Sequence, residues 1–319
     1  MSFSNPLDRA IVQTLSYFDL IDFPLTLEEL FSYLWCSPEI SYADFSAYLH
    51  AVNTKAWETQ GGYYFLPGRS STVALREQHV VPTEQMLKKA RRAARFISWL
   101  PFLKAILVCN SVGSETATCE SDIDVLIITE PQRIWLVRFF AHSILRLFGL
   151  RTYGNKTAGR MCLSFFVDTD HLNMESLRVR PDDIHFAYWL HQMAPVYDAG
   201  AFAARFKEAN AWTKTYLPNL DQTLGLSVTT THQVRLGRVG RFFKFILEKM
   251  WGTAYGAIIE NEAKKVQWQS ITPKIKELAE LKDNNVVLSD GILKFHEHDT
   301  RRLQYERWIK KISYASENN

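Results

Sequence analysis

The sequence predicts an α+β protein with three successive regions, at residues 1–75, 76–180 and 181–319. Near the middle of the chain, an apolar run, a turn of small residues and a second apolar run indicate paired strands of a sheet. The first region has three segments of helical periodicity followed by a hairpin pattern, and helical periodicity dominates the third. A sheet-containing core between two largely helical regions is therefore the expected architecture.

Length and composition are those of a folded protein. The chain has 319 residues, of which 47% are hydrophobic and 13% aromatic, and these fractions exclude an intrinsically disordered protein. The net charge of +3 is too small to indicate a nucleic-acid partner by itself. No uncharged apolar run reaches the roughly 20 residues of a membrane helix, and the first residues lack a signal-peptide pattern. We therefore expect a cytoplasmic protein with no membrane partner. Its scattered cysteines are expected to be free thiols (Cys36, Cys109, Cys119 and Cys162).

The first region has the element order of a winged helix-turn-helix. Pro6 opens a first helix, and Thr26 with Glu29 forms a capping box at the start of a second. A third helix is expected over 41–51, followed by a hairpin with Gly61-Gly62 at its turn. The third helix contains no Lys or Arg, although phosphate contacts supply most of the affinity for nucleic acid. The sequence therefore argues against duplex DNA as a partner and favours a docking or substrate-positioning module.

The middle region has two aspartates at the head of an apolar strand. The segment 106–108 reads as one strand, and a second begins at Asp122 and continues as an apolar run to Ile128. Because successive side chains of a strand alternate between its faces, Asp122 and Asp124 share one face. Two adjacent carboxylates repel each other unless a cation lies between them, and Mg²⁺ prefers such oxygen ligands. The turn at 110–114 offers N–H groups and hydroxyls to the phosphates of a nucleotide.

This stretch resembles the signature of the polymerase-β-like nucleotidyltransferase superfamily. Its small bacterial and archaeal members carry Gly-Ser after the first strand, then a pattern like Gly-x-Ala-x-x-x-Ser-Asp-x-Asp and a hydrophobic residue. The matching residues are Ser111, Ala117, Ser121, Asp122 and Asp124. Asn110 and Glu115 stand where the superfamily has glycine. Asn tolerates a positive φ better than other non-glycine residues, so Asn110 is expected to keep the turn geometry. Glu115 would repel phosphates unless it points to solvent.

The resemblance implies a nucleotidyltransferase (polymerase-β-like) mixed-sheet core between the winged helix and the helical region. It implies a Mg²⁺-dependent enzyme that moves a nucleoside monophosphate from a nucleoside triphosphate to an acceptor hydroxyl by a two-metal mechanism. Asp122 and Asp124 would hold the two Mg²⁺ ions, and the residues that bind the nucleotide would be Asn110, Ser111 and Ser121. The acceptor stays open between an RNA end, a protein hydroxyl and a small molecule.

The superfamily carries a third carboxylate, the base towards the acceptor, on a later strand. The corresponding strand here is 161–168, and it has no acid in its middle. Strict alternation puts Cys162, Ser164 and Asp168 on one face of this strand. Asp168 is the acidic candidate on it, so we expect Asp168 to be the catalytic base on the face shared with the first two aspartates.

Two other functions stay open. The departures at Asn110 and Glu115, with the missing central acid, would also suit a nucleotide-binding sensor or scaffold that has lost catalysis. The winged helix would suit a nucleic-acid-binding regulator, although the absence of Lys and Arg from its third helix weakens that hypothesis.

Three further charged stretches each have two interpretations. The basic segments at 88–95 and 235–244 are either solvated helix faces or contacts to phosphates, RNA or an acidic partner. His296, His298 and Asp299 either bind a metal or are surface residues beside a helix N-cap. We expect the solvated faces and the N-cap.

Overall fold

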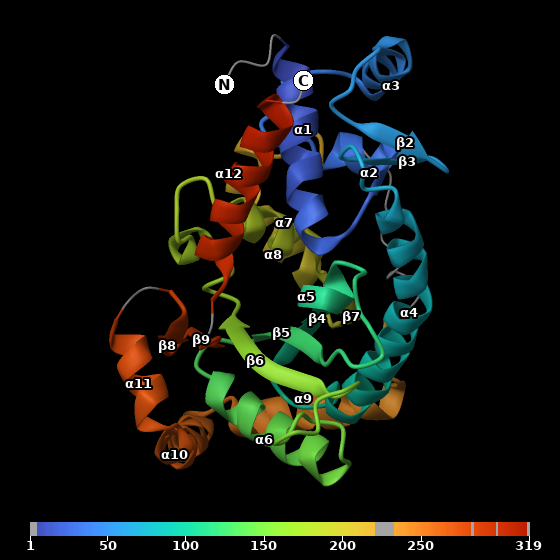
Figure 1. The fold of residues 1–319 in the computed structure, drawn as a ribbon. Helices are drawn as coiled ribbons and strands as arrows, with labels where there is room; N and C mark the ends of the chain where they lie inside the picture. The colour runs from blue at the N-terminus through green and yellow to red at the C-terminus, as the bar shows by residue number, and fades with distance from the viewer. Residues whose placement is uncertain (1–4, 221–232, 282–283, 298, 318–319) are drawn as a thin grey trace.

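A computed structural model describes residues 5–220, 233–281, 284–297 and 299–317. These residues form a six-stranded mixed sheet, a separate three-stranded antiparallel sheet and helices around both (Figure 1). The expected α+β class is therefore confirmed. No helix of the described residues combines the length and apolar character that crossing a membrane requires.

The larger sheet contains the aspartate motif in its centre. Its strand order is β7-β4-β5-β6-β9-β8, with β5 and β6 parallel and every other neighbouring pair antiparallel. β4 and β5 are the paired strands that the motif predicts. The bounds are β4 (Leu103–Val108), β5 (Ile123–Thr129), β6 (Met161–Asp168), β7 (Ala194–Asp198), β8 (Val286–Leu288) and β9 (Ile292–Phe295).

Helices cover both faces of this sheet and enclose two apolar clusters. One face, with Ile106 and Ile127, packs against α4, α6 and α10. The opposite face, with Leu107 and Leu126, packs against α7 and α8. Because both faces are buried, the central strands read as continuous apolar runs rather than alternating ones. The bounds are α4 (Ser71–Ile97), α6 (Ile134–Leu147), α7 (Ile184–Gln192), α8 (Phe202–Ala209) and α10 (Ala254–Ser270).

The first region forms the elements that its sequence predicts. The hairpin of β2 and β3 turns at Gly61 and Gly62, which both have positive φ, and β1 pairs with β3. The predicted capping box is present: Thr26 Oγ1 accepts from the Glu29 N–H, and Glu29 Oε2 accepts from the Thr26 N–H. The bounds are α1 (Pro6–Phe18), β1 (Leu25–Thr26), α2 (Leu27–Ser32), α3 (Tyr42–Ala51), β2 (Glu58–Gln60) and β3 (Tyr63–Phe65).

The region after residue 180 is not purely helical, and in this respect the prediction is wrong. It supplies β7, which lies beside β4, and the hairpin of β8 and β9, which lies beside β6. The hairpin has a sequence signal, since two short apolar runs flank Ser289-Asp290-Gly291. However, β8 and β9 are too short to give a clear alternating pattern between the flanking helical segments. The remaining helices are α9 (Arg238–Trp251), α11 (Pro273–Glu280) and α12 (Arg301–Glu317), with 3₁₀ turns at Asp19–Ile21, Glu175–Leu177 and Ala211–Thr215. The polar composition of residues 219–233 predicts a loop, and most of this segment lies outside the described residues.

The last helix completes the core of the first region. α12 lies along α1 (Figure 1), and Trp308 is buried in the same apolar cluster as Ile11 and Leu15. Trp308 Nε1 donates a hydrogen bond of 2.8 Å to the Gln13 carbonyl. The first and third regions therefore share one core.

We predict that Trp308→Ala lowers the free energy of unfolding by about 3–5 kcal/mol, the usual cost of deleting a buried aromatic side chain. Chemical denaturation followed by circular dichroism measures this loss. Leu303→Ala is the matched control on the same helix, because Leu303 is 46% exposed, and it should cost less than about 1 kcal/mol. Equal losses for both variants would contradict the shared core.

Candidate functional site

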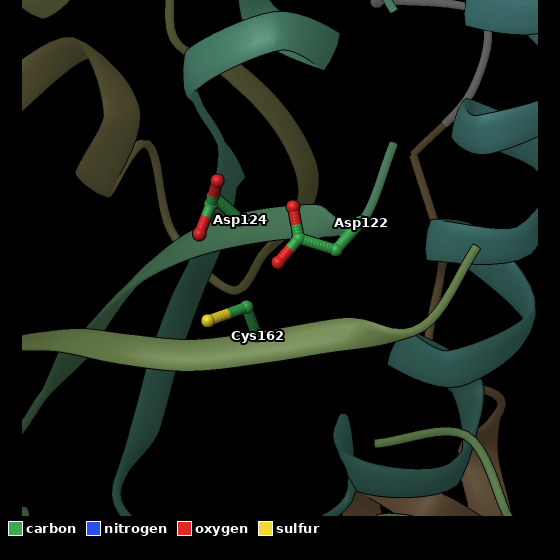
Figure 2. Close-up of side chains that lie close together, drawn as sticks. All are labelled: Asp122, Asp124 and Cys162. Carbon is green, nitrogen blue, oxygen red and sulfur yellow. The ribbon is translucent and has the colours of Figure 1, made fainter. Parts of the chain in front are cut away.

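Two carboxylates and a thiol meet where β5 and β6 begin. Asp122 directly precedes β5, Asp124 is its second residue, and the buried side chains of Ile123 and Val125 take the opposite face. Asp124 pairs in parallel register with Cys162 of β6. One ligand atom each of Asp122, Asp124 and Cys162 lies within 4.8 Å of the other two (Figure 2). The predicted pair of aspartates is therefore together on one face. The third member, Cys162, has no metal-ligand spacing to other cysteines or histidines in the sequence, so no motif indicates this role.

The electrostatics of this cluster are unfavourable without a cation. Burial and the neighbouring Asp124 charge raise the pKa of Asp122 to about 6. Burial and the same charge raise the pKa of the Cys162 thiol to about 12. The Asp122 carboxyl and the Cys162 thiol therefore both lose their protons less readily than usual. A divalent cation would offset the repulsion and lower both pKa values.

Asn110 orients Asp124. It begins the four-residue helix α5 (Asn110–Gly113) with a φ of 51°, so the predicted left-handed conformation is confirmed. Its Nδ2 donates to Asp124 Oδ2 at 2.7 Å, while its Oδ1 accepts from Trp189 Nε1 of α7 at 2.7 Å. Glycine could supply the backbone conformation here, but not this link between α7 and the cluster.

Glu115 also stands in the left-handed region, with a φ of 60°. Both non-glycine residues of the motif thus keep the backbone conformation that glycine adopts readily. The Glu115 side chain is half-buried instead of pointing to solvent. Burial and the Glu29 charge raise its pKa, and Arg76 of α4 opposes the shift. Glu115 therefore faces the first region of the chain.

The turn uses many of its own polar groups. The N–H groups of residues 113–116 donate to carbonyls of residues 109–112. The Ser121 hydroxyl accepts from the Thr118 N–H at 2.9 Å and so closes the turn before β5. Ser111 is half-buried within α5. A phosphate at this turn would therefore depend on the first residues of α5, including Ser111.

The structure does not bring Asp168 to the cluster, and this prediction is wrong. Asp168 pairs with Thr129 at the far end of β5, whereas Cys162 pairs with Asp124 at its beginning. A bulge also adds one residue to β6 between these positions, because Asp124 pairs with Cys162 but Leu126 with Phe165. Because of this extra residue, Phe165 lies on the same face of the sheet as Cys162. Asp168, three residues after Phe165, therefore lies on the opposite face. The Asp168 carboxylate instead accepts from the His171 ring at 2.6 Å and the Asp170 N–H at 3.0 Å.

The metal interpretation of the histidine segment is also not supported. Asp299 forms ion pairs with Lys294 and Arg301 and accepts from the Arg301 N–H at the start of α12. It thus stands at the helix start, as the second interpretation predicts, but its side chain is buried and not on the surface. These partners hold its pKa well below the usual range. His296 donates to or accepts from the Ser164 hydroxyl at 3.1 Å. His298 lies outside the described residues.

The two basic segments differ. Lys88, Arg92 and Arg95 are exposed on α4, and Lys88 pairs with Glu84, as expected of a solvated face. In the second segment Lys244 is buried and donates to the Leu100 carbonyl at 2.9 Å, so it does not belong to an exposed basic stripe.

Comparisons with protein-family models, curated proteins and solved structures found no match.

We predict that Asp122→Asn stabilises the metal-free protein at pH 7. Asp122 has a pKa of about 6 in the folded protein against 3.8 ordinarily, so between these values the folded state binds more protons than the unfolded chain. Stability therefore falls as pH rises from about 4 to about 6. The full shift would correspond to about 3 kcal/mol, and solvent screening of this partly exposed carboxyl makes the loss smaller. Asparagine removes this loss.

Thermal unfolding with EDTA at pH 4 and pH 7 tests this expectation. The gain of Asp122→Asn over the wild type should be present at pH 7 and small at pH 4. Glu120→Gln is the matched control, because Glu120 is an exposed carboxylate two residues away. A gain that does not depend on pH would contradict the assigned repulsion.

Proposed function

We propose that this protein is a divalent-metal-dependent nucleotidyltransferase. The acceptor hydroxyl oxygen would bond to the α-phosphorus of a nucleoside triphosphate, the bond from that phosphorus to the β-bridging oxygen would break, and pyrophosphate would leave. The observation that carries the proposal is the Asp122–Asp124 pair beside the strand-and-turn motif. Its ligand atoms and those of Cys162 lie within 4.8 Å of one another.

The donor set suits a divalent cation. Asp122 and Asp124 would hold it, and the raised pKa of Asp122 reflects a charge that a cation would neutralise. When bound, such an ion supplies charge neutralisation for the triphosphate and lowers the pKa of a coordinated hydroxyl. Asn110 would keep Asp124 in position through its 2.7 Å hydrogen bond. Ser111 would contact the phosphates.

Cys162 occupies the place at which a third carboxylate would meet the pair. Mg²⁺ takes oxygen ligands, whereas a thiolate favours Zn²⁺ and other softer metals. A thiol with a pKa of about 12 is also a poor base at neutral pH. The proton of the acceptor hydroxyl would therefore pass to water or to a group that the acceptor brings.

The experiment is thermal unfolding with ATP, GTP, CTP and UTP, each with and without Mg²⁺ or Mn²⁺. We expect a metal-dependent rise in melting temperature with at least one nucleotide, since a ligand that binds the folded state stabilises it. Asp122→Asn combined with Asp124→Asn should abolish the rise, while Glu120→Gln should preserve it. Undiminished nucleotide binding by the double variant would overturn the proposal.

Metal preference gives a further prediction. Cys162→Asp creates a cluster of three carboxylates and should increase Mg²⁺ affinity at least about tenfold, because a third charged oxygen ligand is added.

The absorption spectrum with Co²⁺ tests whether the Cys162 thiol binds the metal. The wild type should show a sulfur-to-metal charge-transfer band, and Cys162→Ser should lose this band. Cys119→Ser is the control, because Cys119 is exposed. A band that survives in Cys162→Ser would exclude the thiol as a ligand.

A second candidate is a nucleotide sensor without transfer activity. One observation favours it: the cluster of described residues that could hold a metal contains two carboxylates and a thiol, and so lacks a third carboxylate. Radiolabelled triphosphates distinguish the candidates. Label transferred to protein, RNA or small molecules supports the enzyme, while saturable binding without transfer supports the sensor.

A further inference from the structure

Three basic side chains lie beside β6, on the sheet face that α6 covers. Arg138 and His142 stand one helical turn apart on α6, so they project from the same side. Arg151, in the loop after α6, forms a parallel bridge with Met161, the first residue of β6. The His142 ring lies 6.4 Å from the ring of Phe166, a β6 residue in the same apolar cluster as Met161.

Each of these side chains has a buried nitrogen without a hydrogen-bond partner among the described residues. The atoms are Arg138 Nε, His142 Nε2 and Arg151 Nε. A guanidinium N–H can only donate, so the two arginine nitrogens lack an acceptor. Native structures rarely leave such groups unpaired, and an unpaired donor often marks an absent ion or ligand. Arg138 is otherwise held in place, because Nη1 donates to Gln267 at 2.7 Å and the guanidinium lies 4.5 Å above the Phe295 ring.

The three groups also lack a neutralising charge. Burial and the two arginines lower the pKa of His142 well below its usual value. Burial and Arg151 lower the pKa of Arg138 to about 10. Burial lowers the pKa of Arg151, and the Cys162 thiol opposes this decrease. No carboxylate of the described residues contributes to these shifts.

We infer that Arg138, His142 and Arg151 form a binding site for a phosphate group. Guanidinium groups match the geometry of phosphate oxygens and donate charge-assisted hydrogen bonds to them. A phosphate would supply the acceptors that the buried N–H groups lack and would favour protonation of His142, which then becomes a third donor. All three side chains are half-buried although the unpaired nitrogens themselves are buried, so a phosphate would reach these nitrogens only if the side chains moved apart.

The position of the site suggests which molecules would bring this phosphate. The Arg151 guanidinium is close enough to Cys162 to be affected by the charge of its thiolate form, and Cys162 belongs to the aspartate cluster. Because α6 and the aspartates lie on opposite faces of the sheet, a phosphorylated acceptor or the nucleotide itself would have to pass around the beginning of β6 to place its reacting group at the aspartates. This extension, unlike the site itself, depends on the proposed function.

The test is calorimetric titration with inorganic phosphate and with pyrophosphate in EDTA, so that no metal contributes. The wild type should bind at least one of them saturably, and Arg151→Gln should raise its Kd at least about tenfold, as expected for a lost charged hydrogen bond. Arg146→Gln is the matched control, because Arg146 is exposed on the same helix and stacks on Tyr153. His142→Gln provides a second variant in case Arg151→Gln is unstable.

Two comparisons separate this inference from the proposed function and identify the source of the phosphate. Asp122→Asn should bind phosphate like the wild type, whatever its effect on nucleotides. Weaker binding of ATP with Mg²⁺ by Arg151→Gln assigns the site to the nucleotide, and unchanged ATP binding assigns it to a phosphorylated acceptor. The inference is overturned if the wild type shows no saturable binding of either anion, or if Arg151→Gln binds them as tightly as Arg146→Gln.

Discussion

Repulsion between the carboxylates of Asp122 and Asp124 is the constraint on which the surrounding structure depends. Both groups stand at the head of a strand whose remaining residues are buried, so water screens their charges only in part. Asn110 donates a hydrogen bond to the Asp124 side chain and is fixed in turn by Trp189. These two hydrogen bonds depend on the left-handed backbone conformation of Asn110, because this conformation determines the direction in which the side chain leaves the backbone.

Local sequence patterns predicted the elements that carry the site. Alternation along β5 put Asp122 and Asp124 on one face, and the tolerance of Asn for positive φ predicted the conformation of Asn110. The same alternation failed on β6, because a bulge adds one residue between Cys162 and Phe165. Pairing with β5 produces this bulge, so the sequence of β6 alone gives no signal for it. Strict alternation therefore predicts the wrong face for Asp168, although it puts Cys162 on the correct one.

The division of the chain into regions was harder to predict for a similar reason. β7, β8 and β9 join a sheet whose centre lies far earlier in the sequence, and α12 shares a core with α1. Such contacts between distant segments leave no periodic signal. α7 links these parts most directly. Its Tyr188 donates to the Tyr33 carbonyl in the first region, and the next residue, Trp189, donates to Asn110.

This connection gives the first region a physical route to the site without any contact to a nucleic acid. A shift of α2 relative to α7 would act on Tyr188, and the same helix fixes Asn110 and hence Asp124 through hydrogen bonds of 2.7 Å. Glu115 provides a second route, since the charges of Glu29 and Arg76 act on its carboxylate. Arg76 itself forms an ion pair with Glu29 and lies 4.1 Å above the Phe23 ring. Packing and hydrogen bonds join the first region to the sheet, and its third helix, which carries Asp44 but no Lys or Arg, takes no part in either route.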